Sequence, residues 1–213
     1  LNLTDIIPSQ VQHEVMNRCE KIWAELGVKV RSALTADING YSWGFSNVLA
    51  AHGVTQLMSS IHTHHGYHPL MCKQKPFRWQ TPEGRSLLVW NGDHYNLGCE
   101  LGIAQTPSFE YTIHDGLSSE HMPAMERAAE RIERYVTSLK EQGYPYDFVP
   151  VSVSSEMTDN APPSLAIDDF IQRYNTLNTG IVLKESTLDI FFDELEQSSV
   201  EIPVYRGDWT DWW

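Results

Sequence analysis

The amino-acid sequence predicts an α/β fold, in which parallel strands alternate with helices along the chain. Two patterns carry this prediction. Apolar residues recur at three- and four-residue steps over residues 9–26 and 117–142, as on one face of a helix. Short apolar runs lie between such stretches, and residues 28–36 are the first of them. Strands joined through helices pair in parallel with right-handed crossovers, so we expect an open sheet or part of a barrel.

The expected helices follow from this periodicity and from the residues at helix ends. Ser9 is the expected N-cap of the first helix, and Gly27 is its expected C-cap. The apolar positions of this helix are Val11, Val15, Cys19, Ile22 and Leu26. The other expected helices span residues 42–52, 117–142, 163–177 and 187–197.

The expected strands are apolar runs bounded by turn residues. They span residues 28–36, 54–61, 146–155, 180–185 and 201–207. Residues 77–90 are expected to form a β-hairpin that turns at Pro82, Glu83 and Gly84, as an insertion between the β/α repeats. No repeat or linker divides the chain, so we expect a single α/β domain over residues 1–213.

The composition is that of a globular protein, with 213 residues of which 41% are hydrophobic. A net charge of −13 argues against partners such as nucleic acid or an anionic membrane surface. Cys19, Cys72 and Cys99 form no CxxC pair, so we expect thiols in a reducing compartment, as in a bacterial cytoplasm. The chain begins without Met and ends on "GDWTDWW", so we expect a piece of a longer polypeptide or a homo-oligomer contact there.

Acidic and aromatic residues follow the predicted strands. Asp37 follows the first strand, Asp159 a later one and Asp208 the last, whereas His94 and Tyr95 follow the hairpin. Each aspartate alone is explained as a turn or cap residue. Together, carboxylates beside rings such as those of Trp43 and Trp209 fit a sugar site. One acid donates a proton, one carboxylate acts as nucleophile, and flat rings stack on the sugar.

A second cluster is the loop "HTHHGYH", which holds four histidines. They are His62, His64, His65 and His68. Imidazoles bind zinc, but the spacing matches none of the helical zinc motifs. The loop is therefore a polar turn, a metal ligand set or a contact for a substrate hydroxyl, and the sequence leaves these three interpretations open.

Several stretches resemble the α-mannosidases of glycoside hydrolase family 38, in its bacterial branch. They are "ADINGYSWGFSNVLAAHGV", "FRWQTPEGRSLLVWNGDHYNLG", "TDNAPPSLAIDDFIQRYN", "STLDIFFDELE" and "EIPVYRGDWTDWW", which occur in the family's order. The resemblance covers most of the chain. It implies part of a seven-stranded β/α barrel, of the glycoside hydrolase and deacetylase type, that hydrolyses α-mannosides with retention and uses zinc.

The resemblance also implies roles for single residues. The family's nucleophile, which ligates the zinc, falls on Asp37, its acid/base on Asp159 and a substrate-reading tyrosine on Tyr95. His94, Trp43, Asp208 and Trp209 are further expected substrate contacts. The family has a histidine where this chain has Tyr41, and its upstream His-x-Asp zinc ligands are not found here. We therefore expect the remaining zinc ligands to lie outside this chain.

Three functions remain open at this point. The first is a zinc-dependent retaining glycosidase that acts on a carbohydrate substrate. The second is a non-catalytic carbohydrate-binding domain on the same scaffold, because the zinc ligands are incomplete. The third is a metal-dependent deacetylase-like hydrolase that uses the loop of residues 62–68.

Overall fold

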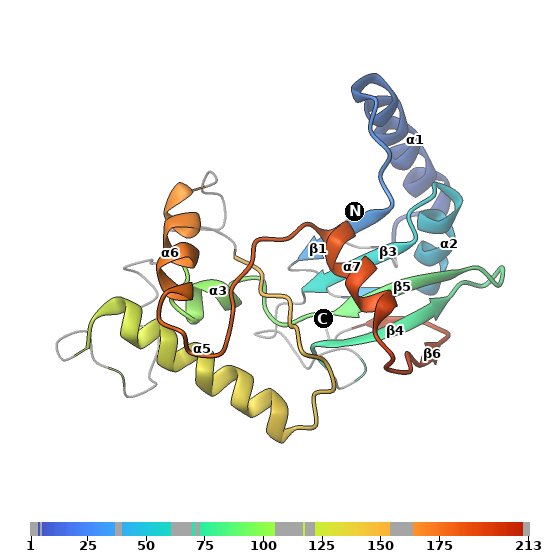
Figure 1. The fold of residues 1–213 in the computed structure, drawn as a ribbon. Helices are drawn as coiled ribbons and strands as arrows, with labels where there is room; N and C mark the ends of the chain where they lie inside the picture. The colour runs from blue at the N-terminus through green and yellow to red at the C-terminus, as the bar shows by residue number, and fades with distance from the viewer. Residues whose placement is uncertain are drawn as a thin grey trace. The chain divides into compact units, whose positions relative to one another are not determined.

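The structure is a computed structural model (Figure 1). It describes residues 4, 6–36, 40–60, 70, 73–104, 117, 122–153 and 164–210. The chain divides into two compact units. Unit 1 comprises Leu1–His94 and Thr187–Trp213, and unit 2 comprises Tyr95–Ser186. The expectation of a single domain stays a prediction.

Unit 1 contains a mixed sheet and three helices. Its helices are α1 (Ser9–Leu26), α2 (Trp43–Ala51) and α7 (Leu188–Gln197). Its strands are β1 (Ser32–Ala36), β2 (Gly40–Tyr41), β3 (Gln56–Ser60), β4 (Lys75–Gln80), β5 (Ser86–Asn91), β6 (Val204–Tyr205) and β7 (Trp209–Thr210). These elements confirm the predicted α/β class and the predicted hairpin, whereas the strand expected over residues 201–207 is reduced to β6.

The main sheet has five strands in the order β1-β3-β5-β4-β6, and β2 pairs with β7 in a second, two-stranded sheet (Figure 1). The pairs β1–β3, β3–β5 and β4–β6 are parallel. Only the hairpin pair β4–β5 in this sheet is antiparallel. Its turn uses Gly84 at φ 87°, a conformation that glycine adopts without strain. The sheet is therefore mostly parallel, as the alternation of helices and strands predicts.

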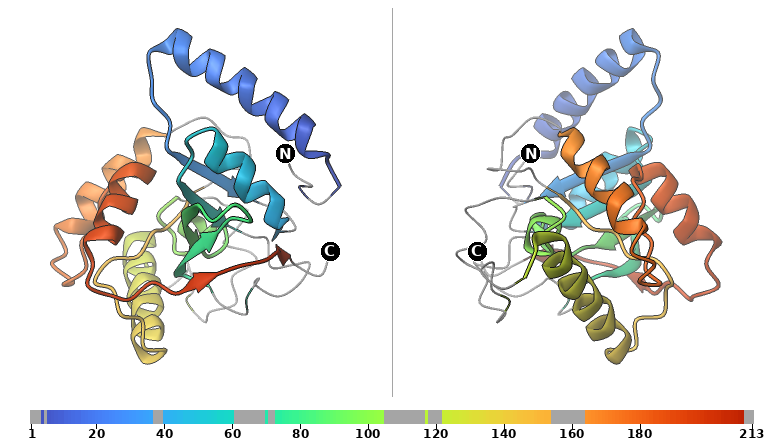
Figure 2. Two further views of the ribbon diagram at one scale, coloured as in Figure 1. Left: turned by 90° about the vertical axis from the view of Figure 1, so that its right-hand side faces the viewer. Right: turned by 60° about the vertical axis from the view of Figure 1, so that its left-hand side comes forward.

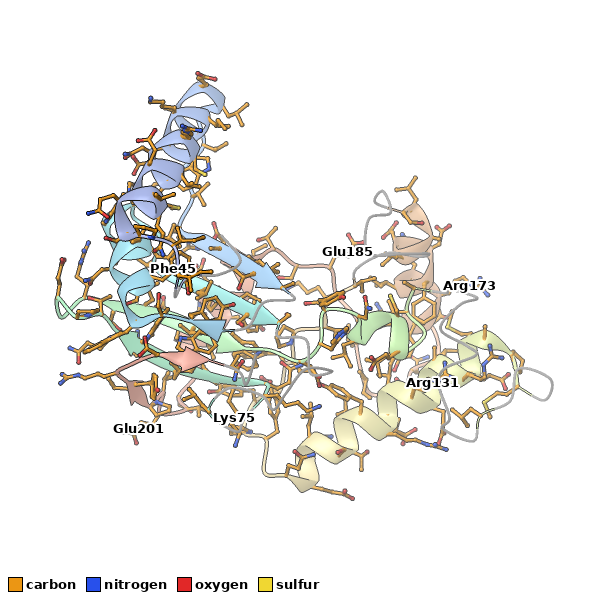
Figure 3. All side chains as sticks on the ribbon, turned by 180° about the vertical axis from the view of Figure 1, so that it is seen from behind. Phe45, Lys75, Arg131, Arg173, Glu185 and Glu201 are labelled. Carbon is orange, nitrogen blue, oxygen red and sulfur yellow. The ribbon has the colours of Figure 1, made fainter. Side chains whose placement is uncertain are left out.

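Helices α2 and α7 cover opposite faces of this sheet. Successive residues of a strand point to opposite faces. Val89 packs in a cluster with Phe45 of α2 (Figure 3), whereas the ring of its neighbour Trp90 lies 5.1 Å from that of Phe191 of α7. All five residues of β3 are buried, because this strand has a partner on each side and a helix on each face.

Helix α1 differs from its predicted packing. The buried residues of α1 are Gln12 and Met16, whereas Val11, Ile22 and Leu26 of the expected apolar face are 48%, 54% and 69% exposed. Gln12 is buried because its amide donates to the carbonyls of residues 4 and 7, at 2.9 Å each. The N-cap is residue 8, one before the predicted Ser9, and the predicted C-cap Gly27 is confirmed at φ 65°.

Helices α1 and α2 pack together through a chain of polar side chains (Figure 2). His52, which caps the C-terminus of α2, has its Nε2 atom 3.0 Å from Nδ1 of His13. Its Nδ1 atom lies 2.8 Å from a carboxylate oxygen of Glu20. On the other side of the unit, Arg31 joins β1 to α7 by ion pairs with Asp189 and Asp193.

The regular structure in the described residues of unit 2 is helical. Its helices are α3 (Leu97–Glu100), α5 (Ala124–Glu141) and α6 (Leu165–Asn175). Helix α5 begins after Pro123, later than the predicted start at residue 117. Helix α6 begins after Ser164, whose hydroxyl accepts a hydrogen bond from the amide of Ala166. No helix in the described part of the chain is long and apolar enough to cross a membrane.

Two predicted strands are wrong in the part of unit 2 that the structure describes. Residues 146–153 and 180–185 run without regular structure, although Val151, Val153, Ile181 and Leu183 pack on the helical core. Neither segment has a strand beside it there. The peptide of Leu183 instead bonds the Asn175 side chain, which donates to its carbonyl and accepts from its amide at 2.9 Å each. The apolar residues of both segments are thus part of the core, although the segments are not β-strands.

Helix α3, which the sequence analysis missed, has a close contact with one of these segments. The amide of Gly98 donates to the carbonyl of Ser152 at 2.9 Å. A Cβ atom at Gly98 would lie 2.3 Å from Cγ2 of Val153 and 3.1 Å from the same carbonyl oxygen. Glycine is required there because any side chain would displace residues 152–153.

Candidate functional site

Polar side chains gather where the three neighbouring parallel strands of unit 1 end. Thr35 of β1, Ser59 of β3 and Asn91 of β5 are register partners across the sheet. Ser59 and Asn91 have no exposed surface. Since residues two apart share a face of a strand, this polar row lies on the same face as Leu57 and Val89, toward α2. Buried polar groups need hydrogen bonds, so a polar row inside an apolar sheet marks the candidate site.

The hydroxyl of Tyr41 contacts two members of this row, Thr35 and Ser59. Its hydroxyl donates to Oγ of Ser59 at 2.8 Å and is also hydrogen-bonded to Oγ1 of Thr35. The residue is fully buried. Burial raises the pKa of Tyr41 to about 12, although its two hydrogen bonds act in the opposite direction. The hydroxyl therefore keeps its proton at neutral pH and acts as a donor.

Gly92 holds β3 and β5 close together at the end of the row. Its amide donates to the carbonyl of Ser59 at 2.7 Å. A Cβ atom at this position would lie 2.9 Å from that oxygen, which is closer than real Cβ atoms approach. Only glycine fits here without a shift of the backbone.

Asp93 places a carboxylate just beyond β5. Its side chain is 10% exposed, and its Oδ2 atom lies 2.9 Å from Nζ of Lys73. Its Oδ1 atom accepts a hydrogen bond from the backbone amide of His94 at 2.8 Å. Such contacts offset the desolvation of a nearly buried charge. The site edge therefore carries a negative group held in a fixed position.

The two predicted catalytic residues lie outside the described residues. Asp37 belongs to residues 37–39, between the end of β1 and the start of β2, and Asp159 to residues 154–163. The histidines of the "HTHHGYH" loop belong to residues 61–69, which are likewise outside them. The catalytic roles of Asp37 and Asp159, and any role of this loop, stay predictions.

Trp43 and Asp208 meet at the first turn of α2. The backbone amide of Trp43 donates to Oδ1 of Asp208 at 2.6 Å, so the exposed Asp208 side chain satisfies an amide that the helix leaves free. The indole N–H of Trp43 donates to the carbonyl of Gln80 at 2.7 Å. The structure thus explains both residues as supports of the helix start, and their binding of substrate stays a prediction.

Trp209 is buried in the core of unit 1. It is 2% exposed, and its ring centroid lies 4.2 Å from that of Tyr41, its partner in the β2–β7 pairing. The rings of Phe77 and Trp79 meet it edge-on. A sugar needs an exposed ring face for stacking, so this burial does not support the predicted contact.

His94 and Tyr95 follow β5 directly, as predicted. His94 is 9% exposed and ends unit 1. Tyr95 is half-buried and begins unit 2, two residues before α3. Their position beyond the carboxyl end of a strand is typical of ligand-binding residues in this class, and their contact with substrate stays a prediction.

The described residues contain no group of three or more His, Cys, Asp or Glu side chains that could share a metal ion. Asp37, the predicted zinc ligand, is not among them. The zinc prediction is therefore not supported by a second ligand in that part of the chain.

Sequence reasoning missed Tyr41, Ser59 and Asn91 as parts of the site. Tyr41 was considered only where it replaces a histidine of the family motif. A signal was present in the chain, because residues 59 and 91 are polar and directly follow apolar residues of β3 and β5. The link between them could not be read locally, since Tyr41 and Ser59 are 18 positions apart.

A mostly parallel sheet with helices on both faces, and polar groups where the strands end, defines an α/β protein with its site at the carboxyl edge of the sheet. Residues 20–208 match the N-terminal domain of the glycosyl hydrolases of family 38. The chain belongs to this family. The resemblance seen in the sequence is thus confirmed.

Among solved structures, the chain is similar to an alpha-mannosidase from Enterococcus faecalis V583. The two share 13% sequence identity with a TM-score of 0.64 over 95% of this chain. The match covers 20% of the Enterococcus chain, so this chain spans about a fifth of that protein's length. At this identity the likeness establishes the fold alone. The comparison with curated proteins found no match.

Proposed function

We propose that this chain carries part of the catalytic machinery of an α-mannosidase-like glycosidase that retains the anomeric configuration. The observation that carries the proposal is the polar row of Thr35, Ser59 and Asn91. This row lies at the carboxyl end of β1, and Asp37 is the next residue after that strand. The chain belongs to family 38, in which the nucleophile is expected at this position.

Asp37 is the nucleophile in this proposal. Its carboxylate attacks the anomeric carbon of the mannoside, and the bond to the leaving oxygen breaks. Asp159 donates its proton to that oxygen and then removes a proton from the water that hydrolyses the glycosyl-enzyme. This mechanism requires the two carboxyl groups to stand about 5–5.5 Å apart. The part of a seven-stranded β/α barrel implied by the family belongs to the same proposal.

His94, Tyr95, Trp43 and Asp208 are the proposed substrate contacts. Trp209 is buried and ranks below them. His94 and Tyr95 follow β5, the strand that carries Asn91 of the polar row. The family is generally zinc-dependent, and we propose that Asp37 is one ligand of that zinc when it binds. Zinc bound there would hold sugar hydroxyls as a template.

The proposal is tested by hydrolysis of 4-nitrophenyl α-mannoside in zinc-containing buffer. We expect Asp37→Ala to lose activity by on the order of 10³-fold, and added azide to restore turnover by forming a β-mannosyl azide. Asp169→Asn is the matched control, because it neutralises an exposed carboxylate on α6 of unit 2. It should keep wild-type activity.

Other outcomes distinguish the alternative functions. Turnover that persists in Asp37→Ala contradicts the assignment of the nucleophile. Binding of mannosides without turnover by the wild-type chain supports a non-catalytic carbohydrate-binding domain. Release of acetate from acetylated sugars, lost on replacing His62 and His64, supports a deacetylase-like enzyme.

A further inference from the structure

We infer that Tyr41 is a positioning residue for Asp37, because its hydroxyl ties β1, which precedes the Asp37 segment, and β2, which follows it, to Ser59 of β3. The inference rests on the proposed function, in which Asp37 is the nucleophile. It assigns Tyr41 no contact with substrate.

The three hydroxyl groups come from three different strands. Thr35 lies two residues before Asp37, and Tyr41 lies four residues after it. Thr35 and Ser59 are register partners in the parallel β1–β3 pairing, and the Tyr41 hydroxyl bonds both. The ends of the chain segment that carries Asp37 are therefore fixed to each other and to the central strand of the parallel group.

The protons in this chain of hydroxyls have one arrangement. Tyr41 has a single hydroxyl proton, which it donates to Oγ of Ser59 at 2.8 Å. Thr35 must then donate to the oxygen of Tyr41. Removing the Tyr41 hydroxyl leaves the hydroxyls of both Thr35 and Ser59 without this partner in a buried site, which is costly.

The ring of Tyr41 is held independently of its hydroxyl. It stacks parallel to the ring of Phe45 at 6.2 Å and lies against Trp79 and Trp209. Tyr41 also pairs with Trp209 through its backbone. Because phenylalanine keeps all of these contacts, Tyr41→Phe removes the hydroxyl alone.

The chain offers a matched control in unit 2. Tyr174 is 1% exposed, and its hydroxyl lies 3.2 Å from Oγ1 of Thr179. Tyr174→Phe therefore removes the hydroxyl of a similarly buried tyrosine that also has a threonine partner. It lies in the other compact unit and outside the proposed site.

The first experiment compares the two variants in the mannoside assay. For a positioning role we expect Tyr41→Phe to lower kcat by at least about tenfold with KM within about twofold, whereas Tyr174→Phe keeps both. Thr35→Val should reproduce the loss, and Thr35→Ser, which keeps the hydroxyl, should restore it. Equal kcat for Tyr41→Phe and Tyr174→Phe, at equal melting temperature, would overturn the inference.

A second measurement separates this inference from the proposed function. Backbone hydrogen exchange reports local order whether or not the chain turns over a mannoside. We expect Tyr41→Phe to speed exchange at residues 40–42 by at least about tenfold, with β3 unchanged. If the wild type is inactive but this change is seen, the proposed function fails and the anchoring by Tyr41 stands. Unchanged exchange at residues 40–42 overturns the anchoring.

Discussion

The two compact units hold their apolar segments in different ways. In unit 1 the strands β1, β3 and β5 pair backbone to backbone along their length, and the side chains of β3 are buried throughout. In unit 2 the peptides of residues 180–185 bond side chains instead, because the Leu183 peptide bonds Asn175 and the Ile181 peptide bonds Oγ1 of Thr179. The difference teaches that burial of an apolar run does not make it a strand, because a strand also needs a partner with free peptide groups.

The largest loss of stability is expected on replacing Trp79, in the core of unit 1. It is fully buried between sheet and helix, and its indole donates to the carbonyl of Gly207 at 2.9 Å. We expect Trp79→Ala to cost about 3–5 kcal/mol of unfolding free energy, because a large cavity remains. Urea unfolding followed by tryptophan fluorescence measures it, with Trp23→Ala, at a partly buried tryptophan on the edge of the same core, as control. A loss below that of Trp23→Ala would contradict the central place of Trp79.

The next largest effect is expected at Asn175. Its side chain makes the peptide hydrogen bonds with Leu183 that a neighbouring strand makes in unit 1. Asn175→Ala leaves the amide and the carbonyl of Leu183 without this partner, so we expect a cost of about 1–3 kcal/mol. Faster hydrogen exchange at Leu183 should accompany it. Asn17→Ala, at an exposed position of α1, is the control and should change little. Unaltered exchange at Leu183 would mean that the Asn175 hydrogen bonds do not hold the segment in place.

The smallest effect is expected at the ion pair between β1 and α7. A hydrogen bond from Arg31, 2.7 Å from Oδ2, lowers the pKa of Asp193 below its ordinary 3.8. A lowered pKa adds stability above pH 3.8 that is lost as the pH falls through the folded value.

Asp193→Asn should therefore lower the melting temperature slightly near neutral pH, and the difference should vanish once the pH has fallen below the lowered pKa of Asp193, where the wild-type carboxyl is also protonated. Glu194→Gln, on an exposed side chain of the same helix, is the matched control. A difference that persisted in acid would show that packing rather than charge is responsible.

Most helices could be predicted because their signals are local. Gly27, Ser164 and Thr187 stand at helix ends and act there as caps. The helix start at residue 124 was missed by several positions, although Pro123 marks it. Propensity and caps are properties of a few neighbouring residues, so they can be read from the chain.

Other features depend on residues far apart in the sequence. Asp208 caps α2 across 165 positions, and nothing near residue 208 indicates that partner. The apolar stripe of α1 was found, but its exposure depends on what packs beside the helix. Tyr41 was visible only as a departure from a motif until its partners on β1 and β3 were placed. Long-range pairing, rather than residue type, decides such cases.

The order of the two units along the chain has a consequence for synthesis. Unit 2 is one continuous stretch, whereas unit 1 joins an early stretch to the last residues of the chain. All of unit 2 is therefore synthesised before α7, β6 and β7. During that interval the first turn of α2 lacks the Asp208 carboxylate, and Tyr41 lacks Trp209 beside it. Unit 1 is completed only when translation reaches its final residues.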